Sequence, residues 1–195
     1  MKRAVFLDRD GTLIEDRGYI CDFAAVGFFP FAADAVRSLN RAGYLVIVVS
    51  NQSAVARGMC TDEQVIRLHG QLQAHFRRLG ADIAAFYHCP FLADGSVAAY
   101  RRQSPLRKPA PGMLLQAARD FDLDLERCFM VGDKADDIEA GRRAGCRTVL
   151  VRTGSGRESE AGLARGGPRP DLIAEDLAAA ACAVASWTGG RTEKE

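Results

Sequence analysis

Short runs of apolar residues alternate along the chain with longer segments in which apolar residues recur every three or four positions. The short runs show no polar alternation, which is typical of strands covered on both faces. The longer segments have the period of amphipathic helices. We predict strands over residues 4–7, 44–49, 83–88, 128–131 and 148–151, and helices over residues 31–41, 61–79, 111–121, 136–144 and 172–187. The pattern does not decide whether a short edge strand precedes the last helix.

Residue types at the expected helix ends agree with these assignments. Thr61 is suited to cap the helix over 61–79, and Gln64 completes the capping-box pattern. Pro111 stands in the first turn of its helix, and Gly43 follows the end of another. Alternating strands and helices predict an α/β fold, a doubly wound, Rossmann-like parallel sheet with helices on both faces.

The remaining segments complete the expected organisation. We assign residues 1–188 to a single domain and residues 189–195 to a flexible tail. Residues 89–106 are expected to form a structured, cap-like loop, and residues 154–170 a mobile surface connection. A chain of 195 residues leaves no room for a large cap domain over such a sheet.

Composition and charge exclude several classes of protein. Hydrophobic residues make up 48% and charged residues 26% of the chain, which is ordinary for a globular domain. The 26 basic and 25 acidic residues leave a net charge of +1, so we expect no nucleic-acid partner. No apolar run approaches the ~20 residues that span a membrane, and the start does not resemble a signal peptide. We expect a monomer without a membrane partner.

The six cysteines are too sparse for a disulfide scaffold, and none forms a CxxC pair. We therefore expect a reducing, cytoplasmic setting. Cys128 and Cys146 lie in or beside predicted strands and are expected to be inert core residues, whereas His69 and His75 are expected on the surface or in a groove of the long helix.

Polar side chains follow several of the predicted strands directly. Asp8 and Asp10 follow the first strand, Ser50 follows the second, and Asp133 follows the fourth. Because ligands of open parallel sheets bind beyond the carboxyl ends of the strands, we expect these groups to share one crevice. Clustered carboxylates repel one another unless a cation lies among them, and oxygen-only donors with open positions suit Mg²⁺. The pattern indicates a phosphoryl-transfer site.

Four motifs carry a resemblance: FLDRDGTL (6–13), VVSNQS (48–53), RKPAPGM (107–113) and MVGDKADD (130–137). In order and spacing they resemble the motifs of the haloacid-dehalogenase superfamily of aspartate-nucleophile phosphatases. Together with NQSAVARG (51–58) and VLVRTG (149–154), they are similar to the small histidinol-phosphatase/heptose-bisphosphate-phosphatase branch. The resemblance covers roughly residues 4–155.

The resemblance implies a role for each matching residue. Asp8 is the nucleophile that forms an aspartyl phosphate, and Asp10 is the general acid and base. Ser50 and Lys108 stabilise the transferring phosphoryl group. Mg²⁺ is the expected cofactor, held by Asp8, Asp10 (through its carbonyl) and Asp133, with Asp137 as a supporting partner. The residues expected to bind the remainder of a small phosphorylated sugar are Asp16, Arg17, Gly18, Tyr19, Asn51, Gln52, Ser53, Arg107 and Lys134.

The chain departs from the family pattern in the loop before RKPAPGM. Many relatives hold a structural zinc there with a C-x-H…C-x-C ligand set, and only Cys89 remains of those four ligands here. We therefore predict no zinc and expect packing of Phe91, Tyr100 and Leu106 to hold the loop. Ala54 also stands where glycine is usual.

The implied reaction is removal of the 7-phosphate from a manno-heptose 1,7-bisphosphate or a close heptose phosphate. A histidinol-phosphate phosphatase is the alternative of the same class, and the NQS-x-x-ARG segment argues against it. A catalytically retired domain that binds a sugar phosphate is the alternative of another class, and the presence of all the expected catalytic residues disfavours it. Action on nucleic-acid ends is a third alternative, which the net charge does not support.

Overall fold

The computed structural model describes residues 1–163 and 166–187. Its centre is a parallel sheet of six strands in the order β3-β2-β1-β4-β5-β6. The strands are β1 (Ala4–Leu7), β2 (Leu45–Asn51), β3 (Ala85–Cys89), β4 (Phe129–Gly132), β5 (Arg147–Val151) and β6 (Leu172–Ala174). The helices are α1 (Ala32–Arg41), α2 (Ser53–Ala56), α3 (Asp62–Arg78), α4 (Gly112–Phe121), α5 (Ala135–Ala144), α6 (Gly156–Leu163) and α7 (Leu177–Ala185).

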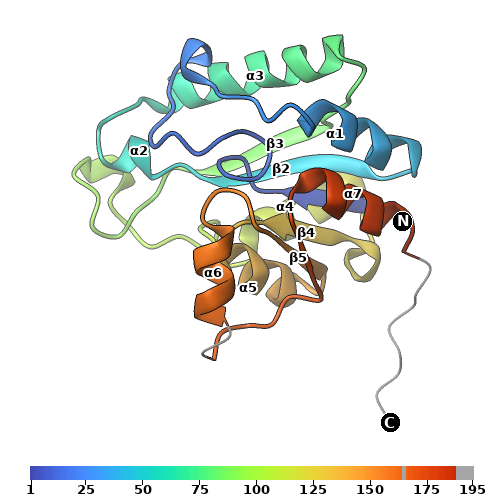
Figure 1. Cartoon of the computed structure of the whole chain (residues 1–195). Helices are drawn as coiled ribbons and strands as arrows, with labels where there is room; N and C mark the ends of the chain where they lie inside the picture. Colours follow the sequence, from blue (N-terminus) through green and yellow to red (C-terminus); the bar gives the residue numbers. More distant parts are fainter. Residues whose placement is uncertain (164–165, 188–195) are drawn as a thin grey trace.

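Helices cover both faces of the sheet because successive strand residues point to opposite sides. Val5 and Leu7 of β1 pack in one core with residues of α1, α3 and α7. Ala4 and Phe6 of the same strand pack in a second core with residues of α4 and α5. Figure 1 shows α1, α3 and α7 on one side of the sheet and α5 on the other. The predicted α/β class and doubly wound parallel sheet are therefore confirmed.

The predicted elements agree with the structure within about two residues at most boundaries. Thr61 caps α3 through a hydrogen bond from the Gln64 amide, and the Gln64 side chain accepts from the Thr61 amide in return. Cys128 and Cys146 are buried, as expected. The longest described helix, α3, has 17 residues, and no described helix is long and apolar enough to cross a membrane.

Three local predictions are wrong or incomplete. Residues 154–170 contain helix α6 (Gly156–Leu163), whose Leu163 packs on Ile138 and Leu150, so this part of the stretch is not a loose connection. The range 172–187 is not helical throughout, since β6 pairs with β5 before α7 begins. The short helix α2 was not predicted. The expected tail at 189–195 lies outside the described residues.

The loop over residues 89–106 is held by contacts with its surroundings. The Leu92 amide donates to the Tyr100 carbonyl, and the Val97 amide donates to the Ala56 carbonyl of α2. Phe91 packs near Tyr100, with ring centroids 6.0 Å apart, and the Arg102 guanidinium lies over the Phe91 ring. His88 turns its Nε2 to Asp62 Oδ1, 2.7 Å away. Among the described residues, no group of three or more metal-binding side chains includes Cys89 or His88. The absence of zinc stays a prediction.

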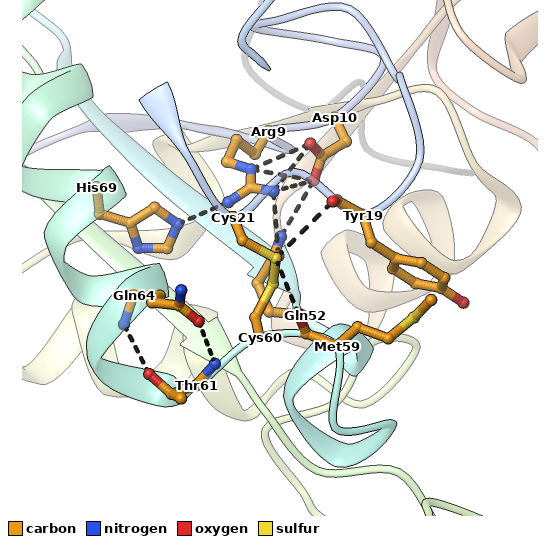
Figure 2. Close-up of a disulfide and its surroundings, with 10 residues drawn as sticks. All are labelled: Arg9, Asp10, Tyr19, Cys21, Gln52, Met59, Cys60, Thr61, Gln64 and His69. Atoms are coloured by element: carbon orange, nitrogen blue, oxygen red, sulfur yellow. Dashed lines mark hydrogen bonds and ion pairs between the residues drawn. A yellow bond between two sulfur atoms is a disulfide. The ribbon is translucent and has the colours of Figure 1, made fainter. Parts of the chain in front are cut away.

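A disulfide joins Cys21 to Cys60, with Cα atoms 5.8 Å apart. It ties the segment after β1 to the segment between α2 and α3 (Figure 2). The low cysteine density argues against a scaffold held by many bridges, but it does not exclude a single bridge between residues 39 positions apart. The reducing setting expected from that density did not predict this bond. The spatial proximity of these two cysteines is a property of the folded chain.

We predict that this bond stabilises the fold. Replacement of Cys21 by serine should lower the free energy of unfolding by about 2–4 kcal/mol, because the unfolded chain regains the freedom that the cross-link removes. Denaturant unfolding of the unreduced native chain and of Cys21→Ser measures the difference. Reductant should destabilise the native chain and leave the variant unchanged.

Thiol titration of denatured protein provides the control. The six cysteines should present four thiols before reduction, corresponding to the four free cysteines, and six afterwards. Six thiols in protein purified without reductant would contradict the bond.

Candidate active site

The carboxyl ends of β1, β2 and β4 meet where the strand order reverses direction. Leu7 pairs with Val48 on one side and with Val131 on the other, so Asp8 after β1, Ser50 near the end of β2 and Asp133 after β4 lie at the same edge of the sheet. A cavity of about 60 Å³ opens there. Its lining residues are Asp8, Asp10, Ser50, Asn51, Lys108, Lys134, Asp136 and Asp137. The structure thus brings together the groups that the sequence placed at the strand ends.

Lys108 is the central cation of the site. Its Nζ lies 2.7 Å from Asp8 Oδ1 and 2.6 Å from Asp137 Oδ1, and it donates to the Val49 carbonyl at 2.8 Å. Asn51 fixes the lysine backbone by accepting from its amide and donating to its carbonyl. Burial lowers the pKa of Lys108, but the attraction of Asp137 and Asp8 outweighs it and leaves this pKa above its usual range. Lys108 is therefore a fixed positive charge.

Three buried carboxylates lie together in the site, and Lys108 pairs with two of them, Asp8 and Asp137. Asp8, Asp133 and Asp137 are buried, and each offers an oxygen within 4.8 Å of the others. Burial, with the charges of Asp8 and Asp137, raises the pKa of Asp133 to about 7. Burial and Asp8 likewise raise the pKa of Asp137 to about 6, although Lys108 acts against the rise. The cluster holds an excess of negative charge that a cation would relieve.

The surroundings of Asp133 fit a bound cation. Its Oδ2 accepts from the Ser155 amide, whereas its Oδ1 is buried and has no hydrogen-bond partner among the described residues. Gly11 and Gly154 both have positive φ, and a Cβ on either would lie 2.4 Å from Oδ2. These two glycines let the backbone close around the carboxylate, so its free oxygen is held in place. Carboxylate and carbonyl oxygens are the donors that Mg²⁺ prefers.

Asp10 has partners different from those of Asp8. The Arg9 guanidinium donates to both of its carboxylate oxygens at 3.0–3.1 Å. Gln52 Nε2 donates to Asp10 Oδ2 at 3.0 Å and to Ser50 Oγ at 2.7 Å. Burial raises the pKa of Asp10 despite the opposing charge of Arg9, and Asp8 adds to the rise. A held carboxyl group with a raised pKa is suited to donate and take back a proton.

Of the remaining expected site residues, Lys134 lines the cavity, and the others lie on several segments of the chain. Lys134 Nζ lies 3.3 Å from Asp16 Oδ2, which connects the start of α5 to the segment after β1. Arg17 pairs instead with Glu15, and Arg107 donates to the Phe91 carbonyl. Gly18 lies in a turn with positive φ, Tyr19 is exposed, and Ser53 begins α2.

Sequence analysis missed several residues that shape the site. Arg9 lies inside the first motif but received no role, although it is only 1% exposed and contacts Asp10. His69 was expected at the surface or in a groove, and it is 5% exposed with its Nε2 3.2 Å from Arg9 Nη1. Asp136 lines the cavity. The available signal was an arginine between two carboxylates directly after an apolar strand, where a cation is expected to find partners inside the protein.

Comparison with known proteins gives consistent results. The family model described as HAD-hydrolase-like matches residues 105–180. A D-glycero-D-manno-heptose-1,7-bisphosphate 7-phosphatase of Thermosynechococcus vestitus is 47% identical over 91% of this chain and 92% of its own. The D-glycero-beta-D-manno-heptose-1,7-bisphosphate 7-phosphatase of Yersinia pestis is 43% identical over 77% of this chain and 81% of its own.

A solved structure extends the likeness to the fold. The D,D-heptose 1,7-bisphosphate phosphatase of B. bronchiseptica, complexed with magnesium and phosphate, superposes with a TM-score of 0.78 at 33% identity. The match covers 93% of this chain and 96% of that one. The chain therefore belongs to the haloacid-dehalogenase-like phosphatases and, within them, to the family of the heptose-1,7-bisphosphate 7-phosphatases.

Proposed function

We propose that the protein removes the 7-phosphate of D-glycero-D-manno-heptose 1,7-bisphosphate through an aspartyl-phosphate intermediate on Asp8. The observation that carries the proposal is the pairing of buried Asp8 with Lys108 in a cavity that Asp10 and Ser50 also line. Two relatives that are named for this reaction are 47% and 43% identical to the chain. The proposed partner is thus a small phosphorylated sugar, and the expected monomer stays a prediction.

We propose Mg²⁺ as the cofactor, bound by Asp8, the backbone carbonyl of Asp10 and Asp133. The unpartnered Asp133 Oδ1 and the excess of carboxylates support this choice. Bound there, the ion would neutralise charge so that an anionic carboxylate can approach a phosphate dianion. Asp137 would support the site by holding Lys108 and the Lys134 amide.

In the first step, the Asp8 carboxylate attacks phosphorus and the bond from phosphorus to the sugar oxygen breaks. Asp10 gives its proton to the leaving oxygen, which departs as an alcohol. Ser50 Oγ already accepts from Gln52, so its own hydrogen is left to donate to a phosphoryl oxygen. The three N–H groups of the Lys108 ammonium point to Asp8, the Val49 carbonyl and Asp137. When Asp8 becomes an aspartyl phosphate it loses its negative charge, which would free one N–H of Lys108 to donate to the phosphoryl group.

In the second step, Asp10 takes a proton from water, and the water oxygen attacks the phosphorus of the aspartyl phosphate. The acyl phosphate bond breaks, Asp8 returns as a carboxylate and inorganic phosphate leaves. The contacts of Arg9 and Gln52 with Asp10 keep its carboxyl group in one orientation for both steps. Such positioning supplies most of the catalysis in phosphoryl transfer.

Substrate choice is proposed to rest with the groups at the mouth of the site. Lys134 and Asp16 contact each other beside the cavity, and either could bind the sugar hydroxyls. Arg107 uses one nitrogen to hold the Phe91 carbonyl, and its forked guanidinium would offer other donors to the second phosphate. The exposed ring of Tyr19 belongs to the segment that the disulfide anchors.

A direct assay tests this function. Purified protein with Mg²⁺ should release phosphate from the heptose bisphosphate with a kcat/KM at least about tenfold above that for histidinol phosphate. A preference for histidinol phosphate would overturn the proposed substrate. Without release from either ester, a binding domain becomes the better description.

Substitution of Asp8 and substitution of Asp10 should impair turnover in different ways. Asp8→Asn should abolish turnover because the nucleophile is gone. Asp10→Asn should lower kcat by about 10²- to 10⁴-fold, since proton transfer is lost while the nucleophile remains. Mass spectrometry of acid-quenched protein should detect a covalent phosphate on the native chain and none on Asp8→Asn. A full rate in Asp8→Asn would exclude the aspartyl route.

The raised pKa values of Asp133 (about 7) and Asp137 (about 6) predict a pH-dependent stability. Their ordinary value is 3.8, so the folded metal-free chain binds more protons than the unfolded chain between roughly pH 4 and 7. The contribution of these groups to stability should therefore decline as pH rises through this window, and Mg²⁺ should stabilise increasingly. Melting temperatures with EDTA or Mg²⁺ at pH 5 to 8 measure both effects.

Asp133→Asn is the matched control for this prediction. It removes one carboxylate from the cluster, so the EDTA melting temperature should depend less on pH and the response to Mg²⁺ should weaken. An identical response to Mg²⁺ in this variant would contradict the proposed cation site.

A further inference from the structure

A buried histidine on α3 lies behind the proposed general acid and has no role in the reaction described above. His69 is 5% exposed, and Figure 2 shows its ring directed at Arg9. The two side chains come from different parts of the chain, since Arg9 follows β1 and His69 lies 60 positions later. Their contact therefore connects α3 with the edge of the sheet where the cavity opens.

Arg9 uses its whole guanidinium to join three side chains. Nε and Nη2 donate to the Asp10 carboxylate, and Nη2 also donates to Gln52 Oε1 at 3.0 Å. On the opposite side, Nη1 lies 3.2 Å from His69 Nε2. A guanidinium is planar and rigid, so the contact of Nη1 with His69 also fixes the directions in which Nε and Nη2 point toward Asp10. The orientation of the Asp10 carboxylate therefore depends on the partner of Arg9 Nη1.

His69 is held as an acceptor for Arg9. Burial lowers the pKa of His69 to about 2, and the charge of Arg9 adds to this effect. The neutral ring can accept at Nε2 and carry its proton on Nδ1. Phe86 of β3 stacks on the ring at 4.9 Å, and His88 packs edge-on at 5.3 Å. His88 is itself bound to Asp62 at the start of α3. These contacts fix where the accepting nitrogen lies.

We propose that His69 is a positioning residue of this phosphatase, which acts through Arg9 to hold the Asp10 carboxyl group in line with the leaving oxygen of the substrate. The inference rests on the proposed function, in which Asp10 protonates that oxygen. Without an acceptor at Nη1, one N–H of a guanidinium that is 1% exposed loses its partner. The guanidinium then turns to find another acceptor, and Asp10 loses its fixed orientation.

The test compares two esters that differ in their need for an acid. The sugar leaves the heptose bisphosphate through an alkoxide oxygen that must be protonated, whereas p-nitrophenolate leaves p-nitrophenyl phosphate as a stable anion without help from an acid. Because kcat/KM reports steps up to the departure of the leaving group, it isolates the step in which Asp10 is the acid. His69→Phe keeps an aromatic ring without an accepting nitrogen. It should lower kcat/KM about tenfold for the sugar ester and less than about twofold for the aryl ester.

His69→Gln is the conservative variant, since its amide oxygen can accept from Arg9. It should restore most of the kcat/KM for the sugar ester. His75→Phe is the matched control: His75 lies on the same helix and stacks on Phe28, 4.3 Å away, outside this network. Both rates of His75→Phe should equal those of the native chain. Melting temperatures show whether each variant is folded.

The outcomes separate this inference from the proposed function. Absence of phosphatase activity in the native chain overturns the function. Normal native activity with an equal loss on both esters in His69→Phe, or with no loss on either, overturns the positioning role. If His69→Phe does not fold, His69→Leu is measured instead. Its side chain also lacks an accepting nitrogen, so the same ester-dependent loss is expected, and an equal loss on both esters overturns the role.

Discussion

The ion pairs of Lys108 with Asp8 and Asp137 are the interaction on which the rest of the site depends. All three groups are buried, and removal of charges from water is costly unless each finds a partner. Lys134 also attracts Asp133, but two ammonium groups cannot neutralise three buried carboxylates, so the cluster retains negative charge. Burial, together with the charges of Asp8 and Asp137, raises the pKa of Asp133, and the remaining negative charge suits the site to a divalent cation. The same charges that oppose folding thus create the binding site.

The parallel sheet makes this arrangement possible. Asp8 and Lys108 are 100 positions apart in the chain and meet because their segments converge at one edge of the sheet. Hydrogen bonds from neighbouring loops then orient the charged groups, such as those from the Ser155 amide to Asp133 and from the Lys108 amide to Asn51. The rigid strands fix where the catalytic side chains lie, and the loops that follow the strands provide most of the reactive and orienting groups.

The two segments that flank the crevice are anchored by different means. The segment after β1 is tied by the Cys21–Cys60 bond and by the contact of Asp16 with Lys134. The loop over residues 89–106 is held by backbone hydrogen bonds and by packing around Phe91. Both anchors involve the region from α2 to the start of α3, because Cys60 lies there and Ala56 accepts from the loop. This region therefore connects both sides of the mouth.

The fold class and the residues at the strand ends can be predicted from the sequence, because apolar periodicity is local and parallel strands place their carboxyl ends at one edge. The pairing of charges, as in the contact of Lys108 with Asp137, and the burial of His69 against Arg9 become visible in the folded chain. The tertiary structure also decided the Cys21–Cys60 bond and the packing of α6 through Leu163. Each of these depends on distances between residues far apart in the chain, which neither periodicity nor spacing encodes.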